Sequence, residues 1–103
     1  METAIANNVT LATNAEGYLL DATQWTLDWA KGVAAKHKIT LTDKHVEVLE
    51  WLRKRQEEGV ALTIRKVGNS GLVDIKQFYQ LFPGGPLKIS SKIAGIPKPA
   101  SCV

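Results

Sequence analysis

Apolar and polar positions between residues 42 and 59 recur with the period of an amphipathic helix. Its apolar face consists of Val46, Leu49 and Leu52. Thr42 or Thr40 can cap the start of this helix, and Gly59 can end it. The opposite face carries charges of both signs, in Lys44, Glu47, Glu50, Arg53, Lys54, Arg55, Glu57 and Glu58. The pattern predicts a helix with one buried face and one solvated face that ion pairs support.

Three other stretches carry helix signals, which are apolar spacing in the first two and start and end residues in the third. The first runs from Thr23, a candidate N-cap, to about Lys36, with apolar residues at Trp25, Leu27, Trp29, Val33 and Ala34. The second has apolar residues at Leu72, Ile75, Phe78, Tyr79 and Phe82 and ends at "PGGP". The third begins at Pro86, since proline suits the first turn of a helix, and Gly95 can cap its end. We therefore predict three more helices.

The N-terminal region predicts a β-hairpin. Val9–Thr13 and Tyr18–Leu20 lie on either side of "NAEG", in which Asn14 and Gly17 tolerate the dihedral angles of a tight turn. A hairpin followed by helices predicts a small α+β fold.

Composition is typical of one globular domain. The 103 residues are 45% hydrophobic and 22% charged, and the net charge of +3 permits an acidic or nucleic-acid partner without requiring one. No stretch approaches the roughly 20 apolar residues of a membrane span, and the N-terminus lacks a secretory signal pattern, so we expect a cytoplasmic protein without membrane insertion. The chain has no CxxC, no zinc-type spacing of Cys and His, no P-loop and no GxGxxG, and we expect neither a metal nor an organic cofactor.

The single cysteine, Cys102, is the penultimate residue and follows the two prolines of "IPKPASCV". Prolines bias this segment toward extended polyproline II geometry, and eight such residues reach at most about 25 Å. A thiol at a chain end is a poor packing residue but an accessible sulfur nucleophile once it ionises. We therefore predict a domain over residues 1–95 and a flexible arm over residues 96–103 that carries a reactive cysteine.

The segment "LFPGGPLKISSKIAGIPKPASCV" resembles the C-terminal signature of the DsrC/TusE family of sulfur carriers, related to the gamma subunit of dissimilatory sulfite reductase. "AEGYLL", Trp25 and "LTDKHVEVLEWLR" extend the resemblance, with Val46 in place of a common tryptophan. The middle, "LTIRKVGNSGLVDIK", is shorter than usual in the family and matches mainly at Arg65 and "GNS". The resemblance implies an N-terminal β-hairpin or meander packed on about five short helices.

The resemblance also implies a chemistry for Cys102. Family members with two cysteines carry the second one eleven positions earlier, where this chain has Ser91. A serine hydroxyl cannot resolve a persulfide, so the resemblance implies the one-cysteine, TusE-like mode. Cys102 would accept a persulfide sulfur from a TusBCD/DsrEFH-like donor complex and pass it to a tRNA thiolase for wobble-uridine 2-thiolation. The chain would act as a sulfurtransferase-type carrier rather than as a stand-alone enzyme.

Several other polar residues could assist this chemistry. We expect Arg65, Lys92 and Lys98 to support the thiolate or persulfide anion, with plain solubility as an equal alternative for the lysines. His45 has no visible Cys or Asp partner and is interpreted as a packing or surface residue, and His37 lies near a helix end, where a cation is favourable.

Two alternative functions stay open. A one-cysteine DsrC-like protein could hand sulfur to a sulfite-reductase-type enzyme in dissimilatory sulfur metabolism. Alternatively, "TIRK" beside a short helix could form a helix-turn-helix-like surface in a regulatory module that contacts nucleic acid directly, although the basic residues are scattered.

Overall fold

The chain folds as a two-stranded ribbon followed by helices. The computed structural model describes the backbone of residues 2–6 and 9–98, and side chains from Leu11 to Lys98. Strands β1 (Glu2–Ala6) and β2 (Val9–Thr13) pair antiparallel, with Glu2 opposite Thr13 and Ala6 opposite Val9. The remaining elements in these residues are the 3-10 turn η1 (Ala22–Gln24) and the helices α1 (Leu27–Lys36), α2 (Asp43–Glu57), α3 (Ile64–Gly68), α4 (Ile75–Leu81) and α5 (Pro86–Ile93).

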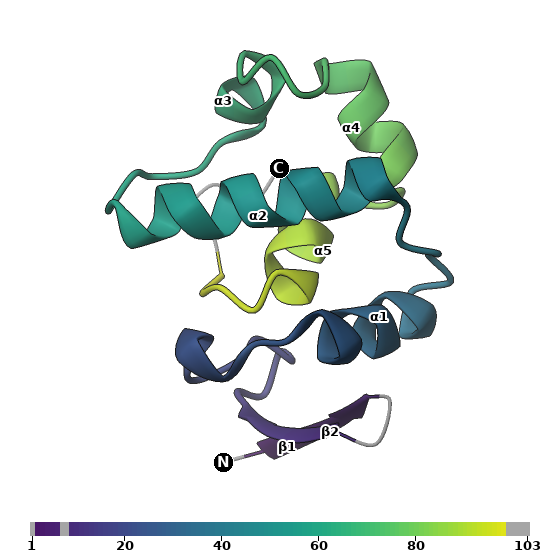
Figure 1. The fold of residues 1–103 in the computed structure, drawn as a ribbon, viewed down its shortest axis with the longest axis vertical. Helices are drawn as coiled ribbons and strands as arrows, with labels where there is room; N and C mark the ends of the chain where they lie inside the picture. The colour runs from purple at the N-terminus through teal and green to yellow at the C-terminus, as the bar shows by residue number, and fades with distance from the viewer. Residues whose placement is uncertain (1, 7–8, 99–103) are drawn as a thin grey trace.

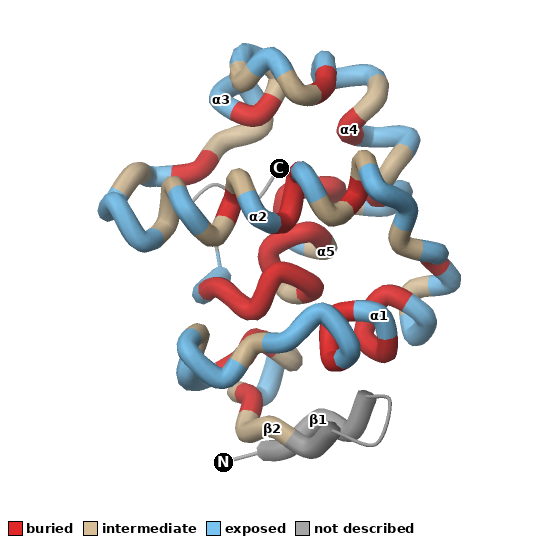
Figure 2. Tube along the Cα trace, in the orientation of Figure 1, coloured by how far each residue is buried: buried red, intermediate tan, exposed pale blue. Residues whose placement is uncertain are grey.

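Helix α5 lies at the centre of the molecule. It sits between α1 and α2, the β-ribbon packs on the outer side of α1, and α3 and α4 lie beyond α2 (Figure 1). Figure 2 shows that most of α5 is buried, and residues 94–96 directly after it are buried as well. Since α1, α2 and α4 all contact α5, the last described residues leave from the middle of the fold.

The core explains why these helices form. Its largest fully buried side chains include Trp29 on α1, Leu49 and Leu52 on α2, and Phe78 and Phe82 in and after α4. Burying each such side chain contributes about 1.5–3 kcal/mol. Leu49 and Leu52 of the predicted apolar face pack inward, but the third core residue of α2 is Val48, and the predicted Val46 is only partly buried. The exposed side of α2 carries the pairs Lys44–Glu47 and Arg55–Glu58, as expected of a solvated face.

Side-chain caps fix where four helices begin. Thr26, Thr42, Thr63 and Asp74 each accept a hydrogen bond from the backbone N–H three residues later. Helix α5 begins differently, with Gly85 as N-cap and Pro86 in the first turn. The predicted caps at Thr42 and start at Pro86 are confirmed.

The helix predicted from Thr23 begins later than expected. The Asp21 side chain accepts from both the N–H and the hydroxyl of Thr23, which holds residues 22–24 in the short turn η1. Trp25 then has extended dihedral angles, and Thr26 caps α1. The prediction was wrong at its start because a local Asp side chain competes with the helix for the backbone N–H groups.

The predicted hairpin between Val9–Thr13 and Tyr18–Leu20 is not confirmed. The Asn14 side chain accepts from the N–H groups of Glu16 and Tyr18. An isolated bridge joins Leu19 to Thr13, and the Leu20 N–H donates to the Ala12 carbonyl oxygen, but residues 18–20 form no strand. Tyr18 and Leu19 are both buried, so packing against the helices replaces a second strand there. β2 pairs with β1 instead, and the molecule is mostly helical. No helix in the part of the chain that the structure describes is long and apolar enough to cross a membrane.

Candidate functional site

The candidate nucleophile, Cys102, lies outside the described residues, so the structure shows the root of its segment. α5 ends at Ile93, and Gly95 follows with a φ of 70°. Ile96, which the sequence assigned to the arm, is only 1% exposed and belongs to the core. Pro97 and Lys98 are exposed, so the described chain leaves the body after Ile96.

Two side chains bind the backbone at this root. Arg53 on α2 donates from Nη1 to the carbonyl oxygen of Ala94 and from Nη2 to that of Ala22, both at 2.9 Å. Trp25 donates from Nε1 to the Ile93 carbonyl oxygen at 2.8 Å. The Arg53 guanidinium carbon lies 4.5 Å from the centroid of the Trp25 ring, a cation–π arrangement. We call Trp25, Arg53 and the backbone of residues 93–96 the root clamp.

The root clamp leaves no room for a side chain at residue 95. A Cβ added to Gly95 would overlap the Trp25 indole and would lie 3.1 Å from Cδ2 of Leu19. Gly95 also has a positive φ, which other residues adopt with strain. Glycine at position 95 therefore has a physical reason, since it lets the chain turn out of α5 directly beneath Trp25.

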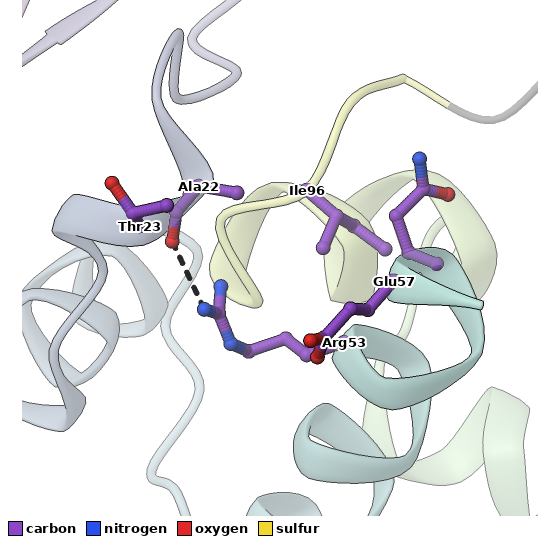
Figure 3. Close-up of a pocket in the computed structure, with 6 residues that line it drawn as sticks. Ala22, Thr23, Arg53, Glu57 and Ile96 are labelled. Atoms are coloured by element: carbon purple, nitrogen blue, oxygen red, sulfur yellow. Dashed lines mark hydrogen bonds between the residues drawn. The ribbon is translucent and has the colours of Figure 1, made fainter. Parts of the chain in front are cut away.

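Two hollows border the root clamp and the residues that follow it. One, of about 410 Å³, is lined by Ala22, Thr23, Arg53, Gln56, Glu57 and Ile96 (Figure 3). A second, of about 240 Å³, is lined by Gln56, Gly59, Val60, Ala61, Leu62, Pro97 and Lys98. Partial burial lowers the pKa of Arg53, an effect that Glu57 opposes, and an arginine guanidinium stays protonated in such surroundings.

The structure brings Lys92 and Lys98 close to the turn that contains Glu16 and Tyr18. Lys98 Nζ lies 2.8 Å from Oε2 of Glu16, and Lys92 Nζ lies 5.4 Å from the centroid of the Tyr18 ring. The hydrogen bond from Lys98 lowers the pKa of Glu16, with added attraction to Lys88 and Lys92. Both partners of the Glu16–Lys98 pair are more than a third exposed, so the pair contributes little stability.

Arg65 lies elsewhere. It is exposed on α3, and in Figure 1 α2 separates α3 from the helix α5 that carries Lys92. Sequence reasoning missed Arg53, which it placed on the solvated face of α2. Charges of both signs alternate along this helix, so the sequence does not distinguish Arg53 from the other charged residues. Only the fold shows that Arg53 faces two backbone carbonyl groups.

Ser91 and His45 are buried polar residues. Ser91 is fully buried on α5, and its Oγ has no hydrogen-bond partner among the residues that the structure describes. His45, 7% exposed, bonds to Thr42 and to the Leu81 carbonyl oxygen, which confirms a packing role. Burial lowers the pKa of His37, and the charge of Lys92 lowers it further, so folding favours the neutral imidazole rather than the cation that a helix end was expected to favour.

Residues 5–103, nearly the whole chain, match the family described as DsrC like protein. The chain belongs to this family. It is 38% identical to the protein named Sulfurtransferase TusE of Pectobacterium atrosepticum, with 91% of this chain and 94% of that protein aligned. Its fold is similar to the NMR structure of Allochromatium vinosum DsrC, with a TM-score of 0.82 and 31% identity over 99% of this chain and 98% of that one.

A crystal structure of the oxidized gamma-subunit of the dissimilatory sulfite reductase (DsrC) from Archaeoglobus fulgidus is also similar. Its TM-score is 0.81 and its identity 28%, over 98% of this chain and 99% of that one. The resemblance that the C-terminal residues suggested is thereby confirmed, and it covers the whole fold as well as the signature.

Proposed function

We propose that this DsrC-like chain is a sulfur carrier that accepts a persulfide sulfur on Cys102 and hands it to a partner protein. The observation that carries the proposal is the family match, which continues through residue 103 and so includes the only thiol of the chain. The relatives named Sulfurtransferase TusE, at 38% and 40% identity in two cases, support it. The burial of Ile96, with Pro97 and Lys98 exposed, supports an arm that begins at Pro97.

The proposed chemistry is two successive thiol exchanges. The Cys102 thiolate attacks the outer sulfur of a donor persulfide, the sulfur–sulfur bond of the donor breaks, and the donor cysteine leaves as a thiolate. Cys102 then carries S–SH. An acceptor thiolate attacks that outer sulfur in turn and regenerates the Cys102 thiolate, so no net oxidation or reduction occurs. The exchange itself uses only thiols and persulfides.

We propose supporting electrostatic roles for Lys92, Lys98 and Arg65. Lys98 lies in the same terminal segment as Cys102, and Lys92 lies on the helix that precedes it. A cation close to a thiolate or persulfide anion stabilises its charged form. Arg65 has weaker support, because it lies on α3 and α2 separates it from α5.

We propose a TusBCD/DsrEFH-like persulfide donor and a tRNA thiolase as the two partners. The TusE names among the relatives favour this role. The similarity to DsrC structures, one of them called a sulfite reductase subunit, favours a second candidate, delivery to a sulfite-reductase-type enzyme. Ser91 limits both roles to single-cysteine chemistry, since a hydroxyl cannot take the place of a second thiol.

Intact-mass measurement tests the proposal. Incubation of the reduced chain with a persulfidated donor complex should add one sulfur, about 32 Da, and a reductant should remove it. Cys102→Ser should abolish the addition and leave the thermal midpoint unchanged. A matched control, Ser101→Ala, should load normally.

Two outcomes would contradict the proposal. One is a reduced wild-type chain that gains no sulfur from any donor complex. The other is salt-sensitive binding to tRNA or DNA that survives Cys102→Ser in a chain that does not load, since phosphate contacts need no thiol. The second outcome would favour the nucleic-acid-binding alternative.

A further inference from the structure

The root clamp joins three parts of the chain that are distant in sequence. Arg53 comes from the last third of α2, Trp25 from the connection between η1 and α1, and the carbonyl oxygens of Ile93 and Ala94 from the end of α5. One guanidinium also bonds Ala22, so it holds η1 and the end of α5 together. Figure 3 shows Arg53 reaching from α2 toward Ala22 beside Ile96.

The bonds of the root clamp are stronger than the contact that follows it. Three hydrogen bonds of 2.8–2.9 Å, two of them from a charged donor, hold carbonyl groups that are partly or fully buried. Hydrogen bonds from charged groups contribute about 1.5–3 kcal/mol each. Beyond Ile96, Pro97 and Lys98 line the smaller hollow, and Lys98 forms an exposed ion pair with Glu16. Among the residues that the structure describes, the root clamp is thus the attachment with the strongest hydrogen bonds at the start of the segment that carries Cys102.

Fixing the root of a segment restricts where its far end can go. Residues 97–102 are six residues, and a chain of that length reaches at most about 20 Å from its anchor. If the root could rotate freely, the thiol could visit every direction within that radius. A root held by bonds to two successive carbonyl groups limits the thiol to a narrower cone.

We propose that Arg53 and Trp25 are positioning residues for sulfur transfer, which fix the direction in which the segment that carries Cys102 leaves the body. This inference rests on the proposed function for its purpose, but its geometric content does not. Neither residue touches the reacting sulfur. They act by holding Ile93 and Ala94, so that the thiol is presented to both partners from the same point of the surface.

Electron paramagnetic resonance distances test the geometric content directly. Cys102 is the only cysteine, so Lys31→Cys on the exposed side of α1 provides a second labelling site, and nitroxides on both report one distance. Arg53→Met keeps a flexible apolar side chain and removes both hydrogen bonds and the cation–π contact of Arg53, and it should broaden the distance distribution by at least about twofold. Trp25→Phe keeps an aromatic ring without the N–H donor and should broaden it less.

Arg55→Met is the matched control. Arg55 lies on the same helix, its guanidinium lies 5.9 Å from the centroid of the Trp51 ring, and it pairs with Glu58 rather than with residues 93–96. It should leave the distribution unchanged. Thermal midpoints of all variants show whether each one is folded, and Arg53→Lys, which can reach one carbonyl group, should give an intermediate width.

A kinetic measurement in the single-cysteine chain tests the purpose. Arg53→Met should lower kcat/KM for loading from a persulfidated TusBCD-type complex by about tenfold, because a misdirected thiol reaches the donor less often. The rate at which iodoacetamide alkylates Cys102 should differ less than about twofold between this variant and the wild type, because a small reagent can approach the thiol from any direction. A purely structural role would move neither rate, and Arg53→Lys should restore part of the loading.

Each outcome has a clear meaning. Unchanged distance distributions in folded Arg53→Met and Trp25→Phe would overturn the inference. Broadened distributions with unchanged loading would also overturn it, since the root clamp would then be structural only. A wild-type chain that does not load would contradict the proposed function, and the distance distributions would still decide whether the root clamp directs the segment.

Discussion

His45 shows how one residue can join two helices. The backbone N–H of Thr42 can only donate, so Nδ1 of His45 must accept it, at 3.1 Å. The Leu81 carbonyl oxygen can only accept, so Nε2 must carry the hydrogen and donate it, at 2.9 Å. The two bonds define one neutral tautomer. The ring also meets Phe82 edge-on, with centroids 5.1 Å apart.

We expect His45→Ala to lower the free energy of unfolding by about 2–3 kcal/mol, because it leaves a buried carbonyl group unbonded and opens space beside Phe82. His45→Gln should cost about 1 kcal/mol less than that, because glutamine at this helix position can still accept from the Thr42 N–H. Urea denaturation measures both values. Lys54→Ala, on an exposed part of α2, is the control and should have almost no effect. Equal losses for His45→Ala and His45→Gln would contradict the role given to the bond with Thr42.

The end of α5 is the element on which the site depends. Gly95, which follows α5, has a φ of 70°, and Gly59, which follows α2, has a φ of 79°. The two positions differ in their surroundings. A Cβ at Gly95 would overlap Trp25, whereas a Cβ at Gly59 would meet nothing within 4 Å. The pair therefore separates backbone strain from packing.

Alanine at Gly59 should cost about 1 kcal/mol through strain alone. Alanine at Gly95 should cost about 3 kcal/mol, because it adds the displacement of the Trp25 indole from the root clamp. Thermal or urea unfolding measures the difference, and tryptophan fluorescence should change in the Gly95→Ala variant only. If the two substitutions cost the same, the close contact between Gly95 and Trp25 would not hold.

The elements that the sequence predicts well are those with strong local signals. α2 and α4 have helical periodicity, α5 has Pro86 as a start signal and Gly95 as an end signal, and their positions are confirmed to within a few residues. α3 spans only Ile64–Gly68, too few residues for a period to be visible, although the family resemblance supplied its place in the helix count. The second strand of the predicted hairpin is not found, because the Asn14 side chain binds the N–H groups of Glu16 and Tyr18 and the pairing beyond them is limited to an isolated bridge.

In the site, too, the sequence predicts residues with a local signal and misses those defined by tertiary contacts. Cys102 stands out in the sequence because it is the single cysteine, and Gly95 because glycine commonly ends a helix. By contrast, nothing in the sequence indicates that Arg53 binds the carbonyl groups of residues 22 and 94. Such contacts join residues that are far apart in the chain, and charge patterning along one helix cannot reveal them. Ile96 was placed in the arm for a related reason, since neighbouring prolines suggest exposure that tertiary contacts override.

Different parts of the molecule have different roles. α5 is held by α1, α2 and α4, the root clamp fixes where the chain leaves α5, and the terminal residues carry the thiol. A rigid body that presents one cysteine suits a carrier, which must meet a donor and then an acceptor with the same residue. Catalysis of a reaction by the body itself is unnecessary in this account.

The measurement that tests this account most directly follows one sulfur atom through both exchanges. The chain is loaded with isotopically labelled sulfur, freed of donor, and mixed with a reduced acceptor thiolase, and the label on each protein is followed by intact mass over time. The account predicts that label leaves Cys102 and reaches an acceptor cysteine in equal amount, without release as sulfide. Label that stays on Cys102, or that appears only as free sulfide at the rate seen without acceptor, would contradict it.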